Sequence, residues 1–360
     1  MNSKIVGIGL ANPGKPISQQ VIGNFMKKAH QLEDMEARKL GFLYRKSGID
    51  TRFSVLDDFD KTDPNEFKFF PKNKTLSPFP GTKARMEIFA EEAPKIASEA
   101  ALDCLKNSNS QANEITHLVL VSCTGMLAPG VELSLMQNLG LNDSIERYCI
   151  HFMGCYAAFT GLKLADKIVR AEPKAKVLLV CVELCTLHFQ KDYSEDNLLA
   201  NSLFGDGAAA ALVSGEGKGL EINGYMSHVL REGNEDMAWG IGDFGFEMKL
   251  TKYIPSLLDK GVHSLRDVFE KRFSISKIKH FAIHPGGKQI LDKVSSAFAL
   301  PRGSNDHAMQ ILRNFGNMSS VTILFVLDRM MRDSEITNEI LALGFGPGLT
   351  MEVMHLNKTE

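Results

Sequence analysis

The residue best suited to act as a nucleophile is Cys155, which stands in the run Phe-Met-Gly-Cys-Tyr-Ala-Ala at residues 152–158. A strand-like segment precedes this run and an amphipathic helix follows it, so the sulfur is expected at a helix N-terminus. The helix dipole and the free backbone N–H groups there favour a thiolate and lower the thiol pKa. Buried cysteines also occur as ordinary core residues, so the role of Cys155 depends on the groups that accompany it.

Three other segments carry groups that would complement a thiol. His284 ends an expected strand and precedes Pro-Gly-Gly, which is typical of the rim of an α/β active site. Asn317 lies in a polar turn before a helix, where helix capping by Asn317 or Ser319 is the competing interpretation. The run Gly-Phe-Gly-Pro-Gly at residues 344–348 predicts a backbone that approaches another group closely. A thiol, an imidazole, a carboxamide and such a loop are the groups that acyl transfer through a thioester requires.

These groups need a scaffold, and the hydrophobic pattern predicts one in which strands and helices alternate. The expected strands cover residues 118–121, 177–182, 207–213, 280–283, 340–343 and 350–354. One expected helix begins near Lys83, and four others cover residues 131–139, 158–170, 289–298 and 321–331. This order predicts an α/β protein with largely parallel sheets that helices cover on both faces. The Gly-rich stretch 215–219 is the best divider, which gives an N-terminal half of residues 1–215 and a C-terminal half of residues 216–360.

Composition narrows the possible partners and location. The chain has 360 residues, 44% of them hydrophobic, and 41 Lys+Arg against 43 Asp+Glu, so its formal net charge is -2. The apolar content favours a folded chain. The near-neutral net charge offers no general attraction to nucleic acid or to an anionic membrane. No apolar stretch approaches the roughly 20 residues of a membrane span. We therefore expect a cytoplasmic protein without stable membrane insertion, with reduced cysteines. Cys181 and Cys185 lie four residues apart but no second ligand pair follows, so no metal site is expected.

Taken in chain order, the motifs resemble those of a known family. The relevant segments are residues 122–125 with 129–130, the Gly154-Cys155 turn, and residues 203–210, 284–287, 314–320 and 344–348. Over nearly the whole chain the sequence is similar to the type III polyketide synthases of the chalcone/stilbene synthase superfamily, in particular to bacterial members. The resemblance implies a thiolase fold, in which two similar halves form a layered αβαβα arrangement.

The resemblance also implies roles for three residues. Cys155 would take the starter acyl group from its CoA thioester, and His284 would hold the cysteine as a thiolate. His284 and Asn317 would then donate hydrogen bonds to the thioester carbonyl of malonyl-CoA, where negative charge develops as CO2 leaves. Loss of CO2 supplies the carbanion, so no cofactor or metal is implied beyond the CoA thioesters that serve as substrates.

Further positions match the cavity and the CoA tunnel of the family. Phe204 matches an aromatic gatekeeper, and Met248 aligns with a second gatekeeper that is commonly phenylalanine. The other implied substrate-binding residues are Cys123, Cys185, Ser319, Gly346 and Pro347 for the cavity, and Lys39 and Lys46 for CoA phosphates, with Lys288 as an additional candidate. Packing is the competing interpretation for Phe204 and Cys123, and a solvated charged face for the lysines. The family is homodimeric, and Ala128 stands where a residue often reaches the neighbouring subunit.

We therefore expect an acyltransferase that condenses malonyl-CoA repeatedly onto an acyl-CoA starter and cyclises the product to a pyrone or a phenol. Ala128 and Met248 favour room for a long acyl starter. Two other functions stay open: a ketoacyl synthase III-like initiating enzyme, which shares the Cys/His/Asn set, and a catalytically silent CoA-binding protein of the same fold. A cysteine protease also uses these residue types in this order, but the alternation of strands and helices does not suit it.

Overall fold

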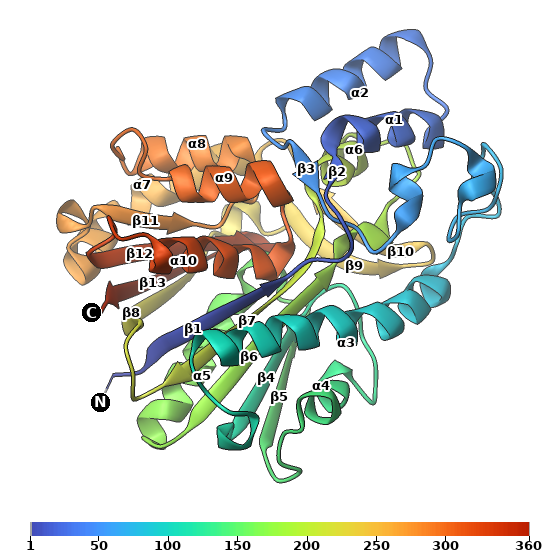
Figure 1. The fold of residues 1–360 in the computed structure, drawn as a ribbon. Helices are drawn as coiled ribbons and strands as arrows, with labels where there is room; N and C mark the ends of the chain where they lie inside the picture. Colours follow the sequence, from blue (N-terminus) through green and yellow to red (C-terminus); the bar gives the residue numbers. More distant parts are fainter. Residues whose placement is uncertain (1, 360) are drawn as a thin grey trace.

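The computed structural model describes residues 2–359, and a nine-stranded sheet runs through its centre (Figure 1). The strands of the N-terminal half are β1 (Lys4–Ala11), β4 (His117–Ser122), β5 (Glu146–His151), β6 (Lys176–Leu184) and β7 (Asp206–Ser214). Those of the C-terminal half are β8 (Leu220–Val229), β11 (His280–Ile283), β12 (Asn338–Gly346) and β13 (Thr350–Lys358). Two small sheets lie beside it, formed by β2 (Ile17–Ser18) with β3 (Thr51–Arg52), and by β9 (Met237–Gly242) with β10 (Gly245–Leu250).

The strand order repeats from one half to the other. Along the sheet the order is β11-β12-β13-β8-β1-β7-β6-β4-β5. In the N-terminal half the order β1-β7-β6-β4 places the last of these four strands in the chain next to the first. The C-terminal half has the same arrangement in β8-β13-β12-β11. The two halves meet through β1 and β8, which pair over only two positions, Lys4 with Glu221 and Ile5 with Leu220. Each half thus forms a sheet of its own, and a short seam joins the two.

The expectation of largely parallel sheets is wrong. Parallel pairing joins β4 to β5, β4 to β6 and β11 to β12. The pairs β1–β7, β6–β7, β1–β8, β12–β13 and β8–β13 are antiparallel. The reason is clearest at β12 and β13, where only the short turn η9 (Pro347–Leu349) separates the strands. A parallel partner needs a crossover of a dozen residues or more, so this turn produces an antiparallel neighbour.

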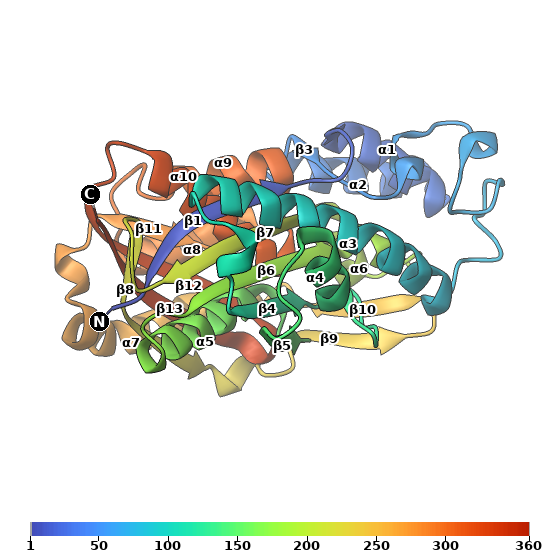
Figure 2. The same ribbon diagram turned by 60° about the horizontal axis from the view of Figure 1, so that its bottom comes forward.

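Helices cover both faces of the sheet, as the pattern predicts (Figures 1 and 2). The N-terminal half contains α1 (Gln19–Ala29), α2 (Asp34–Lys46), α3 (Thr82–Asn107), α4 (Val131–Leu139), α5 (Ala157–Ala171) and α6 (Glu195–Leu203). The C-terminal half contains α7 (Ile254–Phe273), α8 (Lys288–Ala297), α9 (Asp306–Phe315) and α10 (Thr322–Arg332). Within residues 2–359 no helix combines the length and the apolar character that crossing a membrane requires.

The alternation of side chains along the strands explains this layering. On β4, Leu118 and Leu120 belong to the hydrophobic cluster that includes α3, whereas Val119 and Val121 belong to the cluster that includes α5 and α10. Successive side chains of a strand point to opposite faces, so a fully apolar strand requires a helix on each side. Because α5 and α10 share one cluster with strands of both halves, a common core links the two halves.

Candidate active site

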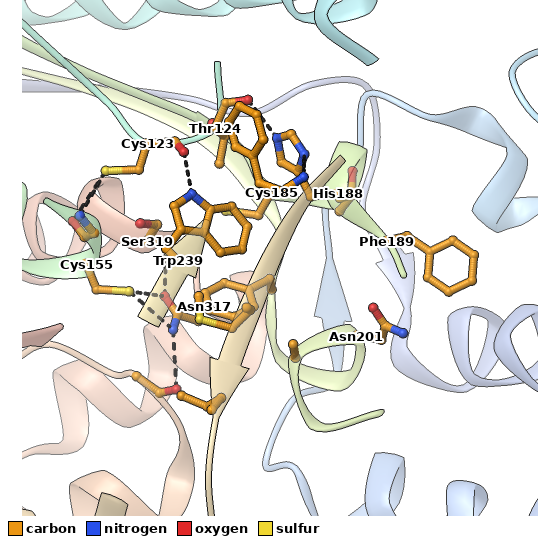
Figure 3. A pocket seen from close by; sticks show the side chains of 18 of the residues that line it. Cys123, Thr124, Cys155, Cys185, His188, Phe189, Asn201, Trp239, Asn317 and Ser319 are labelled. Carbon is orange, nitrogen blue, oxygen red and sulfur yellow. Dashed lines mark hydrogen bonds between the residues drawn. The ribbon is translucent and has the colours of Figure 1, made fainter. Parts of the chain in front are cut away.

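Cys155, His284 and Asn317 line a single cavity, although they come from different halves of the chain. The space between its lining residues, including the part that is open to solvent, is about 1130 Å³. Figure 3 shows Cys155 and Asn317 close together on one side, with Phe189 and Asn201 on the other side. The cavity therefore continues well past the thiol, and its far end is lined by different elements.

The local backbone presents the thiol at the start of α5. Cys155 lies in the short turn η4 (Gly154–Tyr156), which leads directly into that helix. Gly154 has φ +73°, and a Cβ atom added there would lie 2.2 Å from Cδ of Pro347. A Cβ at Gly346 would lie 2.6 Å from Cδ1 of Tyr156. The predicted close approach of the 344–348 loop is therefore made to the cysteine turn itself, and it requires glycine on both sides.

The Cys155 sulfur contacts the Asn317 carboxamide. Sγ lies 3.9 Å from Nδ2 and 4.0 Å from Oδ1 of Asn317. The amide is held on both sides, because Oδ1 accepts from the backbone N–H of Ser319 at 2.9 Å and Nδ2 donates to the Gly286 carbonyl at 3.3 Å. These bonds fix the orientation of the carboxamide, so its N–H group points towards the sulfur and the segment that follows His284.

Burial favours the neutral forms of both Cys155 and His284. Desolvation raises the pKa of the Cys155 thiol to about 11, against the opposing hydrogen bonds of Ser319 and Asn317. Desolvation also lowers the pKa of His284 to about 3, and among residues 2–359 neither of its ring nitrogens has a hydrogen-bond partner. Burial therefore favours a thiol and a neutral imidazole in the same cavity, and the imidazole still has a lone pair to accept a proton.

A buried carboxylate that sequence reasoning missed connects the two halves beneath the site. Glu183 on β6 accepts hydrogen bonds from the Cys123 backbone N–H at 2.9 Å, Thr124 Oγ1 at 2.8 Å and Ser320 Oγ at 2.6 Å. Cys123 in turn accepts a bond from the Gly154 N–H at 3.0 Å through Sγ. Burial raises the pKa of Glu183. A single glutamate in an apolar strand gave no sequence signal beyond its charge.

The predicted cavity residues Phe204, Met248, Cys185, Ser319, Cys123 and Pro347 all line this cavity, and Gly346 lies behind the cysteine turn. Phe204 is held beside Asn317 by backbone pairing, because Gly205 N–H donates to the Asn317 carbonyl and Asn317 N–H donates to the Leu203 carbonyl, each at 2.9 Å. Phe204 and the Asn317 amide are therefore fixed together.

An aromatic wall lines the cavity on the β9–β10 side. The His188 ring stacks on Phe246 with centroids 4.1 Å apart, and the Trp239 ring meets His188 edge-on. His188 accepts from the Phe246 N–H through Nδ1 at 2.9 Å, so we assign the ring proton to Nε2, which donates to the Thr124 carbonyl at 2.7 Å. Trp239 Nε1 donates to the Cys123 carbonyl at 2.7 Å. These bonds hold a C-terminal hairpin against the N-terminal half.

A second cavity adjoins the first. Both are lined by Leu250, Gly286 and Ile290, and the second is also lined by Lys46 and Lys288. Lys39 lies exposed on α2, outside the lining of these two cavities. The basic residues of the sequence prediction are thus divided, with Lys46 at the adjoining cavity and Lys39 on the surface nearby.

The two similar halves and their shared strand order identify a thiolase-like fold. The structure superimposes on the type III polyketide synthase domain of Steely1, a type I/III hybrid from Dictyostelium, with a TM-score of 0.91 at 27% identity and full coverage of both chains. It also superimposes on PKS-I of the brown alga Ectocarpus siliculosus, with a TM-score of 0.91 at 28% identity over 99% of this chain and 98% of that one.

Sequence comparison identifies the family. The family models "Chalcone and stilbene synthases, N-terminal domain" and "Chalcone and stilbene synthases, C-terminal domain" match residues 2–217 and 221–359. The chain therefore belongs to the chalcone/stilbene synthase family of type III polyketide synthases, which are acyl-CoA condensing transferases. The predicted family and fold are confirmed.

Two curated relatives match over almost the whole chain. "Alpha-pyrone synthesis polyketide synthase-like Pks18" of Mycobacterium tuberculosis is 30% identical over 97% of this chain and 90% of its own length. "Probable polyketide synthase 1" of Dictyostelium discoideum is 29% identical over 98% of this chain, but the match spans only 11% of that much longer protein.

Proposed function

We propose that this protein transfers an acyl group from a CoA thioester to Cys155 and extends it with malonyl-CoA. The observation that carries the proposal is the enclosed cavity in which the Cys155 sulfur lies within 4.0 Å of the Asn317 carboxamide and His284 is present with unbonded ring nitrogens. A nucleophile, a proton acceptor and an amide N–H donor at one buried point suit thioester exchange and enolate stabilisation.

In the loading step, Sγ of Cys155 attacks the carbonyl carbon of the acyl-CoA. The thiol proton passes to a ring nitrogen of His284, and the bond from the acyl carbon to the CoA sulfur breaks. The proton then leaves with the CoA thiolate as free CoA. Because burial favours the neutral pair, the thiolate forms as attack occurs rather than beforehand.

In the extension step, malonyl-CoA loses CO2 and leaves an enolate whose oxygen accepts hydrogen bonds from Asn317 Nδ2 and a His284 ring N–H. The enolate carbon attacks the acyl-Cys155 thioester, the carbon–sulfur bond to Cys155 breaks, and a β-ketoacyl-CoA results. The apolar face of Phe204 disfavours the malonyl carboxylate and so favours the loss of CO2. Repetition followed by ring closure gives a pyrone or a phenol, and the pyrone is favoured because the Pks18 relative is named for alpha-pyrone synthesis.

The adjoining cavity supplies a path for the pantetheine arm. It meets the reaction cavity at Leu250, Gly286 and Ile290, and its lining includes Lys46 and Lys288, whose positive charges support a contact with the CoA phosphates. We propose that the starter is an apolar acyl chain of medium or greater length. The reaction cavity continues to Ile22 and Met26 of α1, to Phe59 of η1 (Asp57–Asp60), and to Phe189. These four side chains are apolar and suit an acyl chain, while Asn197 and Asn201 add polar groups to the same lining. As in the family, the enzyme would act as a homodimer.

The deciding experiment supplies malonyl-CoA with acyl-CoA starters from acetyl to long-chain acyl, without any carrier protein, and analyses the products by mass spectrometry. We expect pyrones or phenols that incorporate labelled malonyl carbons. If no starter gives a condensation product until a carrier protein is added, the ketoacyl synthase III-like alternative replaces this proposal. If Cys155 also forms no acyl adduct, the protein is a silent CoA-binding member of the fold.

A further inference from the structure

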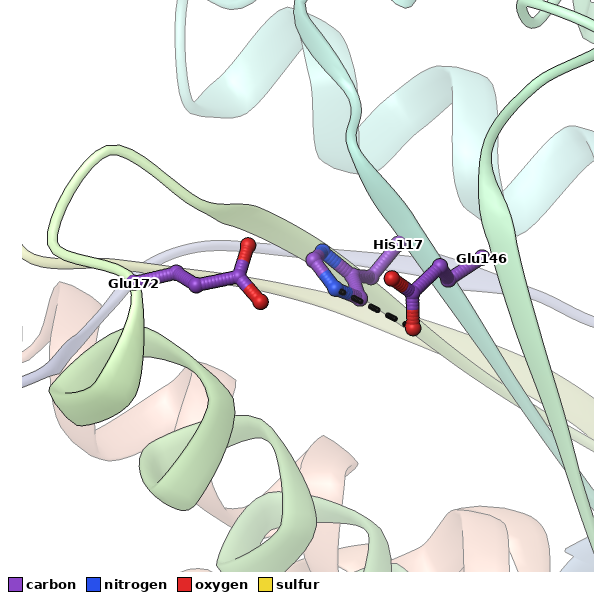
Figure 4. Close-up of side chains that lie close together, drawn as sticks. All are labelled: His117, Glu146 and Glu172. Atoms are coloured by element: carbon purple, nitrogen blue, oxygen red, sulfur yellow. Dashed lines mark ion pairs between the residues drawn. The ribbon is translucent and has the colours of Figure 1, made fainter.

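Three metal-binding side chains meet at the end of the sheet opposite the cavity (Figure 4). His117 opens β4, Glu146 opens β5, and Glu172 directly follows α5. One nitrogen or oxygen from each of them lies within 4.8 Å of the others. They come from separate elements, so no sequence spacing indicates them, and none takes part in the chemistry proposed above.

His117 is buried and held in one orientation. Its exposed fraction is 3%, and Nδ1 lies 2.7 Å from the Thr116 hydroxyl. That hydroxyl donates its only proton to the Lys176 carbonyl at 3.1 Å and accepts from the Lys176 N–H at 3.0 Å. We therefore assign the imidazole proton to Nδ1, where the hydroxyl oxygen accepts it. Nε2 then carries a lone pair and faces the carboxylates.

The carboxylates around this lone pair are not neutralised by a neighbouring lysine or arginine. His117 Nε2 lies 3.9 Å from Oε2 of Glu146, and within residues 2–359 it forms no hydrogen bond. The two nearby basic side chains are directed elsewhere, because Lys176 pairs with Glu114 at 2.7 Å and Arg147 faces Glu132 at 3.9 Å. The Tyr148 hydroxyl donates to Oε2 of Glu146 at 2.7 Å, which is a neutral contact and leaves the charge uncompensated. A lone pair that faces two negative groups favours a cation among them.

We propose that this cluster, His117 with Glu146 and Glu172, binds a divalent metal ion of the zinc class. Imidazole and carboxylate ligands together suit Zn²⁺, and three protein ligands leave one position for water. Ligands about 2.0–2.2 Å from a tetrahedral zinc ion lie about 3.3–3.6 Å apart. The three side chains, whose ligand atoms now lie within 4.8 Å of one another, must therefore close by about 1 Å when the ion binds. The Glu146 side chain is 61% exposed, and although its Oε2 accepts from the Tyr148 hydroxyl at 2.7 Å, its Oε1 is open to a metal ion. The Thr116 contact is the outer-shell bond that orients a metal-binding histidine.

The position of the cluster gives the ion a structural role. At their other ends, β4 leads to Cys123, β5 leads to the Cys155 turn, and α5 begins just after Cys155. The helix separates the two sites by about 22 Å for its 15 residues. A bound ion would therefore tie together the far ends of the three elements that hold the nucleophile, without touching substrate.

The test titrates Zn²⁺ into the full-length protein by calorimetry and measures thermal unfolding with and without the metal. We expect one ion per chain and a melting temperature that rises with Zn²⁺. Glu146→Gln and Glu172→Gln should each weaken binding at least about tenfold while leaving the metal-free melting temperature unchanged. Glu99→Gln, which removes an exposed carboxylate on α3, is the matched control and should bind as the parent does.

Cys149 is the exposed cysteine among those of residues 2–359 and a competing zinc ligand, so Cys149→Ser completes the set. The proposal is overturned if the parent shows no saturable binding at one ion per chain, if both glutamine variants bind as tightly as Glu99→Gln, or if Cys149→Ser alone abolishes binding. None of these results depends on polyketide synthase activity, so they are independent of the proposed function.

Discussion

Ser320, at the N-terminal side of α10, donates a hydrogen bond of 2.6 Å to Glu183, which lies on β6 in the other half of the chain. The same carboxylate accepts from Cys123 and Thr124, so one buried side chain joins the loop after β4 to the segment that carries Asn317. The placement of Asn317 relative to the loop after β4 therefore depends on the hydrogen bonds of Glu183.

Removal of this acceptor should destabilise the fold. Glu183→Ala leaves three buried donors without a partner, and each costs about 1–3 kcal/mol, so the free energy of unfolding should fall by about 3 kcal/mol or more. Glu183→Gln is the matched variant, because its carbonyl still accepts from Cys123 and Thr124 and its amide can donate to Ser320 Oγ. Urea unfolding followed by circular dichroism measures both. Equal stability of the alanine and glutamine variants would contradict this account of Glu183.

Cys155→Ala should abolish loading and chain extension, because no acyl thioester can form. Mass spectrometry of the intact protein after exposure to acyl-CoA should show one acyl adduct in the parent and none in this variant. Cys149→Ser, which changes an exposed thiol outside the cavity lining, should retain the adduct. An adduct of unchanged yield in Cys155→Ala would assign the nucleophile to another residue.

Asn317→Ala should slow decarboxylation of malonyl-CoA by about 10²–10³-fold, the range for the loss of one oxyanion donor. Release of labelled CO2 measures this step separately from loading, which should be affected less. Asn314→Ala changes an exposed asparagine three positions earlier and serves as the control. If CO2 release from Asn317→Ala matches that control, Asn317 has no part in the step.

The pKa of Cys155 predicts how alkylation of the free enzyme depends on pH. A thiol pKa of about 11 means that the thiolate fraction, and with it the rate of carboxamidomethylation at Cys155, should rise about tenfold per pH unit from pH 7 to 10. Peptide mapping separates Cys155 from Cys149. A rate that is already constant at pH 7 would show a preformed thiolate–imidazolium pair instead of the neutral pair that burial favours.

Filling the far end of the cavity should shorten the preferred starter. Met26 lines that end from α1, and its exposed fraction is 3%, so Met26→Trp places a larger ring in the path of a long chain. We expect kcat/KM for a long-chain acyl-CoA to fall at least about tenfold, the effect of about 1.4 kcal/mol. Acetyl-CoA should retain its rate, which controls for misfolding. An equal loss for both starters would place the long chain elsewhere.

The strands and helices that sequence reasoning located are those whose pattern is strongly apolar. Residues 280–283 and 131–139 form β11 and α4 with the predicted bounds, because an apolar run or a helical stripe ends at a clear turn signal in each case. The β9–β10 hairpin was missed, since its exposed residues, such as Ile241, and its glycines break the alternation that identifies a strand.

For the site, the sequence was informative where one residue type is chemically required. Cys155, His284 and Asn317 stand out by type and by the turns around them, and the structure brings them to one cavity. Trp239 could not be recognised as part of its wall, because its role depends on a bond between a C-terminal hairpin and an N-terminal loop. The charge of Lys39 was visible in the sequence, but its distance from the cavity lining was not.

The wall built by Trp239 and His188 has a consequence for how such enzymes diversify. Because the chamber is enclosed by contributions from both halves, neither half alone carries the information that selects a product. A chimera that joins residues 1–215 of this chain to the remainder of a relative would inherit every chemical group it needs, yet enclose a chamber that belongs to neither parent. New products can therefore arise by recombining halves while the reaction itself is conserved.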